Sequence, residues 1–301
     1  MARLSARRAA YQESLWPELA DLEKVVNVAS VSQLSPFRYP GGKTWLVPSL
    51  IRWLLSLPKR PEEFIEPFAG GGIGSLTAAD MELTDHVTMV ELDADVASVW
   101  QTMFSSHAEW LANEVAQFDL TIETAEVRLG SGGCDLQEKA FKTLLRNRIC
   151  HGGILAAGSG IIKNGENGRG IRSRWYPETL RKRILKVAAL RSKITFINGD
   201  GIQVMRDNAH RPEAVFFIDP PYTAAGKKAG SRLYTHFELD HEDLFRVTST
   251  LTGDFLMTYD DAAGVRELAD KYGFQMRTIA MKNTHHAEMK ELIIGKNLDW
   301  V

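Results

Sequence analysis

Short apolar runs alternate with amphipathic stretches along most of this chain, which is typical of a sheet covered by helices. We predict strands at residues 64–67, 87–91, 194–198, 214–219, 254–259, 275–281 and 292–294. Helices are predicted between them, among others at 95–104 and 177–192. The order strand, glycine turn, helix, strand over residues 64–91 predicts the start of a parallel α/β sheet.

The sheet pattern is interrupted once. Residues 105–193 are mostly helical or loop in pattern, and we interpret them as an insertion into a sheet domain formed by residues 35–104 and 194–301. Residues 1–34 are expected to form an N-terminal helical extension, since their apolar positions recur at helical spacing. No internal repeat is present.

Composition excludes several classes of protein. The chain has 301 residues, of which 44% are hydrophobic and 25% charged, as expected of a globular domain. No apolar run approaches the roughly 18–20 residues of a membrane span, so we expect no membrane partner. Two cysteines, Cys134 and Cys150, cannot build a disulfide framework, and no signal-peptide pattern is present. We therefore expect a cytoplasmic protein.

The net charge of −2 conceals a strong regional asymmetry. Residues 139–193 contain fourteen basic and two acidic residues, a net charge of +12, so the rest of the chain carries −14. Such a segment is typical of an element that binds a polyanion such as nucleic acid. The alternative interpretation is a solvated helical face of unusual composition.

A glycine turn follows the first predicted strand. The segment Glu66–Gly72 (EPFAGGG) closes the strand and opens a helix, where small residues let backbone amides approach a ligand. Glu91 ends the next strand about twenty residues later, a position from which a carboxylate can accept hydrogen bonds from a ribose diol. A purely structural turn and a solvated glutamate remain the alternatives.

The most specific signal is Asp219-Pro220-Pro221-Tyr222, which follows the apolar strand AVFFI. The two prolines remove backbone donors and fix two φ angles, so they present a rigid surface of carbonyl acceptors. An amino group bound there would meet the Asp219 carboxylate and the Pro220 carbonyl, while Tyr222 could stack on a flat base. An ordinary loop is the alternative.

These segments together resemble the D12-class (Dam-like) adenine-N6-specific DNA methyltransferases. The resemblance follows the family's motif order through Phe37–Lys43, Phe64–Gly72, Val90–Asp93, Asn198–Asp200, Asp219–Thr223 and Asn283–Ile294. It implies a Rossmann-like mixed sheet of the S-adenosylmethionine-dependent methyltransferase fold, with a mainly helical basic insertion for target recognition. The chain departs from the family at Glu91, where Asp is common, and at Tyr39, where Trp is frequent. The insertion resembles other members only loosely.

The resemblance also implies roles for individual residues. The residues implied to hold S-adenosylmethionine are Tyr39, Lys43, Glu66, Phe68, Ala69, Gly70, Glu91 and Asp200. Within this set Lys43 is expected at the methionine end, Glu91 at the ribose and Asp200 at the exocyclic amine, although a helix cap is an alternative role for Asp200. Asp219 and Pro220 are expected to orient the N6 amine of a flipped adenine, on which Tyr222 stacks.

We expect double-stranded DNA as the partner. Arg38 aligns with a family position that can contact DNA, and the polar loop of the insertion supplies further candidates in Lys163, Arg169, Arg172 and Arg174. No metal is required by this chemistry, and His285 and His286 are not expected to be catalytic. The family suggests a bacterial or phage-encoded, nucleoid-associated enzyme, and it leaves open the oligomeric state and whether a cognate restriction endonuclease accompanies it.

Other interpretations remain at this point. The same motifs could serve methylation of another amine, such as cytosine N4, RNA adenine or a protein glutamine. The Asp before Pro-Pro-Tyr disfavours methylation of a protein glutamine, because enzymes with that activity usually have Asn at this position. A catalytically silent DNA-binding protein of the same fold is the alternative from a different class.

Overall fold

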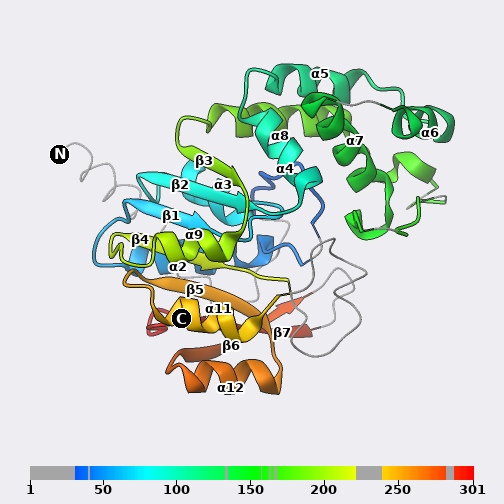
Figure 1. Ribbon diagram of the computed structural model, residues 1–301. Helices are drawn as coiled ribbons and strands as arrows, with labels where there is room; N and C mark the ends of the chain where they lie inside the picture. The colour runs from blue at the N-terminus through cyan, green and yellow to red at the C-terminus, as the bar shows by residue number, and fades with distance from the viewer. Residues whose placement is uncertain are drawn as a thin grey trace.

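A seven-stranded mixed sheet forms the centre of the molecule (Figure 1). The computed structural model describes residues 31–39, 41–132, 135–156, 158–162, 164–165, 168–221, 239–282 and 288–301. The strands are β1 (Glu63–Glu66), β2 (His86–Glu91), β3 (Ile194–Asn198), β4 (Ala214–Ile218), β5 (Phe255–Asp260), β6 (Gln275–Lys282) and β7 (Glu288–Gly295). Their order is β3-β2-β1-β4-β5-β7-β6. Strands β1 to β5 pair in parallel, and β7 runs antiparallel to both β5 and β6. The predicted mixed α/β sheet is confirmed.

Ten α-helices connect or extend these strands in the described residues. They are α2 (Val47–Ser56), α3 (Ile73–Asp80), α4 (Ala94–Met103), α5 (Ala108–Gln117), α6 (Ile122–Gly130), α7 (Leu136–Ile149), α8 (Pro177–Ala189), α9 (Gly201–Asp207), α11 (His241–Ser249) and α12 (Ala263–Lys271). Short 3-10 helices lie at η2 (Thr44–Leu46), η3 (His151–Gly153) and η4 (Gly170–Arg174).

The sheet is buried on both faces because its strands carry apolar side chains at successive positions. Phe64 and Phe217 belong to the hydrophobic cluster that contains side chains of α2, α3 and α4. Their neighbours Ile65 and Phe216 belong to the opposite cluster, with side chains of α9, α11 and α12. This alternation produces three layers, with helices on each face of the sheet.

Helices α5, α6, α7 and α8 gather on one side of the molecule, away from β6 and α12 (Figure 1). Their packing is tight, because α5 lies against α8 and α7 lies against α4. Leu111 of α5, Phe141 of α7 and Ile184 of α8 are fully buried in the same cluster as the α4 side chains. The segment between β2 and β3 thus shares its core with the sheet.

Acidic partners from outside residues 139–193 neutralise part of the basic segment. Lys139 and Arg146 approach Asp95, Lys186 pairs with Asp80, and Lys193 pairs with Glu82. Arg148, Arg174 and Arg183 of the same segment line a cavity.

Three local predictions needed correction. Strand β7 begins at Glu288, well before the predicted residue 292, because it pairs with two neighbours, β5 and β6. The apolar spacing of residues 45–54 predicts one amphipathic helix after the glycine pair 41–42, and the structure divides it into η2 and α2. Pro48 lies in the first turn of α2, where its missing N–H costs no hydrogen bond. Residues 31–34 are not helical, and Leu34 is buried in the core. The remainder of the predicted N-terminal extension lies outside the described residues. Within them, no helix is long and apolar enough to cross a membrane.

Candidate active site

A cavity of about 1110 Å³ opens at the carboxyl ends of the central strands. It is lined by the glycine turn after β1, the end of β2, residues 219–221 after β4 and parts of the inserted helices. In the strand order, β1 lies between β2 and β4, so the connections leave in opposite directions on either side of it. Open α/β sheets bind their ligands at such a switch point.

The glycine turn is shaped to fit Tyr39. Gly70 has a φ of +48°, and a Cβ atom added there would lie 2.6 Å from the Tyr39 ring. The Gly70 amide donates to Glu91 Oε2 at 2.8 Å, and its carbonyl accepts from Trp100 Nε1 at 3.0 Å. The turn is therefore fixed from both sides, and only glycine allows the aromatic ring to lie against it.

Glu91 links the glycine turn to the end of β2. Its second oxygen, Oε1, accepts from the Asp93 amide at 2.8 Å, and the side chain is buried. Burial raises the pKa of Glu91 to about 7, against the effect of the hydrogen bonds from the Asp93 and Gly70 amides. Asn198 Nδ2 of β3 donates to the Glu91 carbonyl at 2.8 Å, which holds the ends of β2 and β3 together.

Asp200 caps helix α9 and also lines the cavity. Its carboxylate accepts from the Ile202 amide at 2.9 Å and so caps α9, which was the alternative role considered from the sequence. Asp200 is also exposed and lines the cavity. A Cβ atom on Gly201 would lie 1.9 Å from the Pro67 carbonyl oxygen, so this glycine lets α9 begin directly against the turn after β1.

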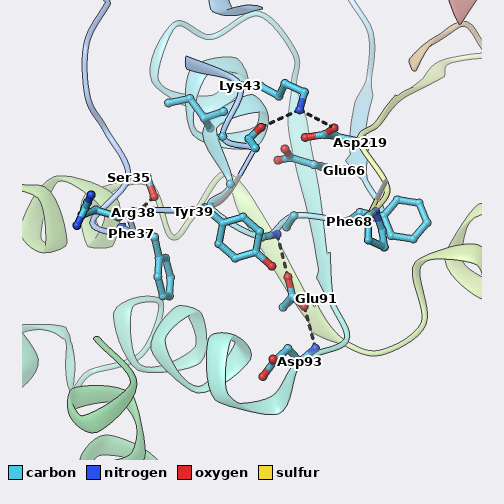
Figure 2. Close-up of a pocket in the computed structure, with 18 of the residues that line it drawn as sticks. Ser35, Phe37, Arg38, Tyr39, Lys43, Glu66, Phe68, Glu91, Asp93 and Asp219 are labelled. Atoms are coloured by element: carbon cyan, nitrogen blue, oxygen red, sulfur yellow. Dashed lines mark hydrogen bonds and ion pairs between the residues drawn. The ribbon is translucent and has the colours of Figure 1, made fainter. Parts of the chain in front are cut away.

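Asp219 lies at the end of β4, where two side chains engage its Oδ1 atom. Lys43 Nζ is 3.1 Å away, and Thr258 Oγ1 of β5 donates at 2.7 Å. Lys43 is buried, donates to the Gly41 carbonyl at 2.7 Å and lies 3.5 Å from Glu291 Oε2 of β7. Figure 2 shows Lys43, Asp219 and Glu66 together, with Tyr39 between this group and Glu91.

Carboxylates outnumber ammonium groups at this end of the cavity. Glu66 is buried, accepts from the Ser75 amide at 2.8 Å, and has its pKa raised to about 8 by burial, with a further contribution from the charge of Asp219. Burial likewise raises the pKa of Glu291 to about 7, although the charge of Lys43 opposes the change. We call the lining residues Glu66, Glu91, Asp219 and Lys43 the acidic end, together with Glu291, which contacts Lys43 but does not line the cavity.

Arginines line the opposite part of the cavity. Arg38, Arg148, Arg174 and Arg183 are among its lining residues, and we call them the basic end. In Figure 2, Arg38 lies well apart from Asp219 and Lys43. The backbone of Arg38 is fixed by Asn147 of α7, which accepts from its amide at 2.8 Å and donates to its carbonyl at 2.9 Å.

The cavity collects most of the residues singled out from the sequence. Its lining includes the following predicted residues: Arg38, Tyr39, Lys43, Glu66, Phe68, Ala69, Gly70, Glu91, Arg174, Asp200, Asp219 and Pro220. Of the other described candidates, Arg169 and Arg172 are exposed and do not line it, and Arg172 pairs with Asp119 at 2.6 Å. Tyr222, Lys163, His285 and His286 lie outside the described residues.

Sequence reasoning missed two residues. Glu291 is an acidic residue directly before the apolar run Leu292-Ile293-Ile294, and a charge in a buried strand is the signal that could have found it. Arg148 follows Phe141, Leu144 and Leu145 at helical spacing, so it occupies an apolar position of α7. In the described residues, no group of three or more His, Cys, Asp and Glu side chains could hold a metal ion.

The strand order, the antiparallel β7 and the cavity beside the glycine turn define an α/β methyltransferase-like fold. Comparison with known proteins then gives the particular family. The model of the D12 class N6 adenine-specific DNA methyltransferases matches residues 39–284, and the chain belongs to this family. It is therefore an S-adenosylmethionine-dependent enzyme that methylates adenine N6 in DNA.

Among solved structures, the chain is similar to a protein of Pyrococcus horikoshii that is provisionally described as an RNA methyltransferase. The sequence identity is 11%, the match covers 95% of this chain and 97% of the other, and the TM-score is 0.40. A search of curated proteins found no match.

Proposed function

We propose that the acidic end of the cavity binds S-adenosylmethionine and holds the N6 amine of a flipped adenine against Asp219. The observation that carries this assignment is the fixed position of Asp219 at the end of β4, beside the glycine turn and in the same cavity. Figure 2 shows Lys43, Glu66, Glu91 and Asp219 among the side chains that line this cavity.

The residues present fit the cofactor. The cavity of about 1110 Å³ is large enough for a nucleoside and a second flat base, and its acidic end has a surplus of buried carboxylates. Glu66 would pair with the cationic methionine part, Phe68, Ala69 and Gly70 would line that part, and Tyr39 would cover it. Glu91 would accept from the ribose hydroxyls, and Asp200 from the exocyclic amine of the cofactor's adenine.

When bound, S-adenosylmethionine supplies an electrophilic methyl group carried on a sulfonium. Asp219 and the Pro220 carbonyl accept hydrogen bonds from the two N6 hydrogens of the target adenine, which frees the nitrogen lone pair for attack. Because Lys43 and Thr258 already fix Asp219, the carboxylate needs no rearrangement in the reaction. This arrangement acts by positioning and electrostatics.

The methylated nitrogen must also lose a proton. In this proposal that proton passes to Asp219, which is hydrogen-bonded to the nitrogen, and from there to water. Lys43 contacts both Asp219 and Glu291 Oε2, so it is assigned a positioning role at Asp219, which differs from the role expected from the sequence at the methionine carboxylate. Glu291 provides a second carboxyl group beside the Lys43 ammonium.

The proposed partner is double-stranded DNA, from which the target adenine is flipped into the cavity at a cost of a few kcal/mol. Arg38 and side chains of α7, α8 and η4 line this cavity, which supports their role in holding the duplex. Under this proposal residues 105–193 act as the target-recognition region.

The test uses the full chain with cofactor labelled in its methyl group and DNA, RNA or protein as acceptor. We expect label in DNA alone and, after digestion, in N6-methyladenine. Expression in a methylation-free host followed by single-molecule sequencing would then identify the modified site. Label found only in RNA, in protein or on cytosine N4 would overturn the proposal.

A further inference from the structure

The basic end of the cavity contains a buried arginine that no described carboxylate neutralises. Arg148 of α7 is 4% exposed, and its Nη2 atom donates to the Pro36 carbonyl. Its Nε atom is buried without a hydrogen-bond acceptor, as is Nη1 of Arg38. In the described part of the chain, no carboxylate oxygen lies within ion-pair distance of Arg38, Arg148 or Arg183.

The positively charged neighbours of Arg148 increase the free-energy cost of burying its charge. Burial, together with the positive charges of Arg183, Arg38 and Arg174, lowers the pKa of Arg148 to about 9, while Tyr176 acts in the opposite direction. An isolated buried charge is expensive, and like charges increase that expense. Nothing in the packing of α7 requires a cation at this position, because a Met or Leu would fill the same apolar stripe.

The arginines are nevertheless held in place. Asn147 fixes the backbone of Arg38 and also donates to the Gly153 carbonyl at 2.7 Å. Arg183 of α8 donates to the Ser35 carbonyl at 3.1 Å. The backbone carbonyls of residues 35 and 36 thus orient two guanidinium groups from different helices toward the same cavity. A rigid group of guanidiniums is suited to an anion with several oxygens.

We propose that Arg38, Arg148, Arg174 and Arg183 form a site for a phosphodiester group of the DNA strand that carries the flipped adenine. The proposal rests on the DNA partner of the proposed function and not on the transfer chemistry. The site lies in the cavity that contains Asp219, so a nucleotide there has its own phosphates within the same opening. The carboxylate of the cofactor is the competing ligand for these arginines, and its binding is measured separately with sinefungin.

The test compares the wild-type chain with Arg148→Met in duplex binding, cofactor binding and thermal unfolding. Arg191→Met is the matched control, because it removes the same charge from an exposed position beyond the end of α8. Duplex affinity is measured by fluorescence anisotropy over a range of salt concentrations. Cofactor affinity is measured by calorimetry with sinefungin, and unfolding by the melting temperature with and without inorganic phosphate.

We expect Arg148→Met to weaken duplex binding about tenfold or more and to reduce the slope of log K against log salt by about one. Sinefungin affinity should stay within about twofold, and the melting temperature should be equal or higher because a buried unpaired charge is removed. Arg191→Met should change neither the duplex affinity nor the sinefungin affinity by more than about twofold. Because the measurements need no turnover, failure of methyl transfer alone would count only against the proposed function.

Several results would overturn the site. Unchanged duplex affinity and salt slope would do so directly. Loss of sinefungin affinity with duplex affinity intact would assign the arginines to the cofactor carboxylate. Stabilisation of the wild type by inorganic phosphate, with no loss of duplex affinity in the variant, would indicate a site for free anions only. A lower melting temperature with normal duplex affinity would make Arg148 structural. If Arg148→Met fails to fold, Arg183→Met, which is half-buried, is put through the same comparison.

Discussion

The acidic and basic ends of the cavity are built from different parts of the chain. The acidic side chains come from the ends of β1 and β2, from the residue after β4 and from β7. The basic side chains come from the segment before α2, from α7 and α8, and from η4. Sheet residues are fixed by their strand neighbours, while Arg148 and Arg183 donate to the backbone carbonyls of residues 36 and 35 and Asn147 holds the backbone of Arg38.

Both ends contain ionisable side chains that are buried away from water. At the acidic end, burial raises the pKa of Glu66 and Glu291, and at the basic end it lowers the pKa of Arg148. These opposite changes have the same cause, since burial disfavours the charged form of each group. A ligand of opposite charge would favour the charged form at each end.

The largest expected effect comes from Asp219→Ala at the acidic end. Transfer to adenine should fall by about 10²–10³-fold or more, because the group that orients the amine is removed. Duplex affinity should remain close to wild type, since the basic end is untouched. Single-turnover rates and anisotropy measure the two properties, and the exposed Asp299→Ala is the control. A wild-type rate of methyl transfer in Asp219→Ala would contradict the role assigned to Asp219.

Glu66 should give cofactor binding a pH dependence. With a pKa of about 8, Glu66 is mostly protonated at pH 7 and must release its proton to pair with a cation. Affinity for S-adenosylmethionine should therefore rise between pH 6 and pH 8, by up to about tenfold per pH unit. In Glu66→Gln it should be about 10–100-fold weaker at pH 8 and show a smaller pH dependence. Calorimetry at several pH values tests this, and an equally steep profile in both proteins would remove Glu66 from the cofactor site.

The same residue predicts an effect on stability. Because the folded pKa of Glu66 is raised from 4.5 to about 8, its protonated form stabilises the folded state below pH 5, and that contribution is lost as the pH rises toward 8. Glu66→Gln should therefore be more stable than the wild type at pH 8.5, by on the order of 1–3 kcal/mol. The difference should shrink at pH 5.5. Urea unfolding at both pH values measures it, and a less stable variant at pH 8.5 would contradict the account.

The smallest effect is expected from Glu291→Gln. Glu291 reaches Asp219 only through Lys43, at 3.5 Å from the ammonium, so transfer should slow by less than about tenfold. Its dependence on pH between 6 and 8 should also change, because the pKa of Glu291 is about 7. Rates measured at several pH values for both proteins test this. A loss of about a hundredfold would place Glu291 among the catalytic residues.

Local chemistry explains why much of the acidic end could be predicted. The glycine turn and the Asp-Pro-Pro segment each determine their own backbone and each follow an apolar strand, so their positions at the sheet edge follow from the sequence. Glu91 was expected beside the turn because of its distance from it along the chain, and its carboxylate does accept from the Gly70 amide. The role of Lys43 was not, because its partners Asp219 and Glu291 are brought to it only by the folded sheet.

In contrast, only part of the basic end could be picked out from the sequence. The charge asymmetry of residues 139–193 was visible in the sequence, yet it did not identify the arginines that line the cavity. Arg172 is held by Asp119, whereas Arg148 is buried, and only the packing of α7 distinguishes the two. Charge along a chain thus predicts that a polyanion binds, and three-dimensional packing decides which side chains lack partners.

A crystal structure of the chain with sinefungin, which carries an amine in place of the sulfonium methyl, tests the division of the cavity most directly. We predict that this amine lies beside Asp219, that the ribose hydroxyls contact Glu91, and that no atom of the ligand reaches Arg148. A ligand carboxylate bound by Arg38, Arg148 and Arg183, with no ligand atom beside Asp219, would contradict the assignment of the two ends.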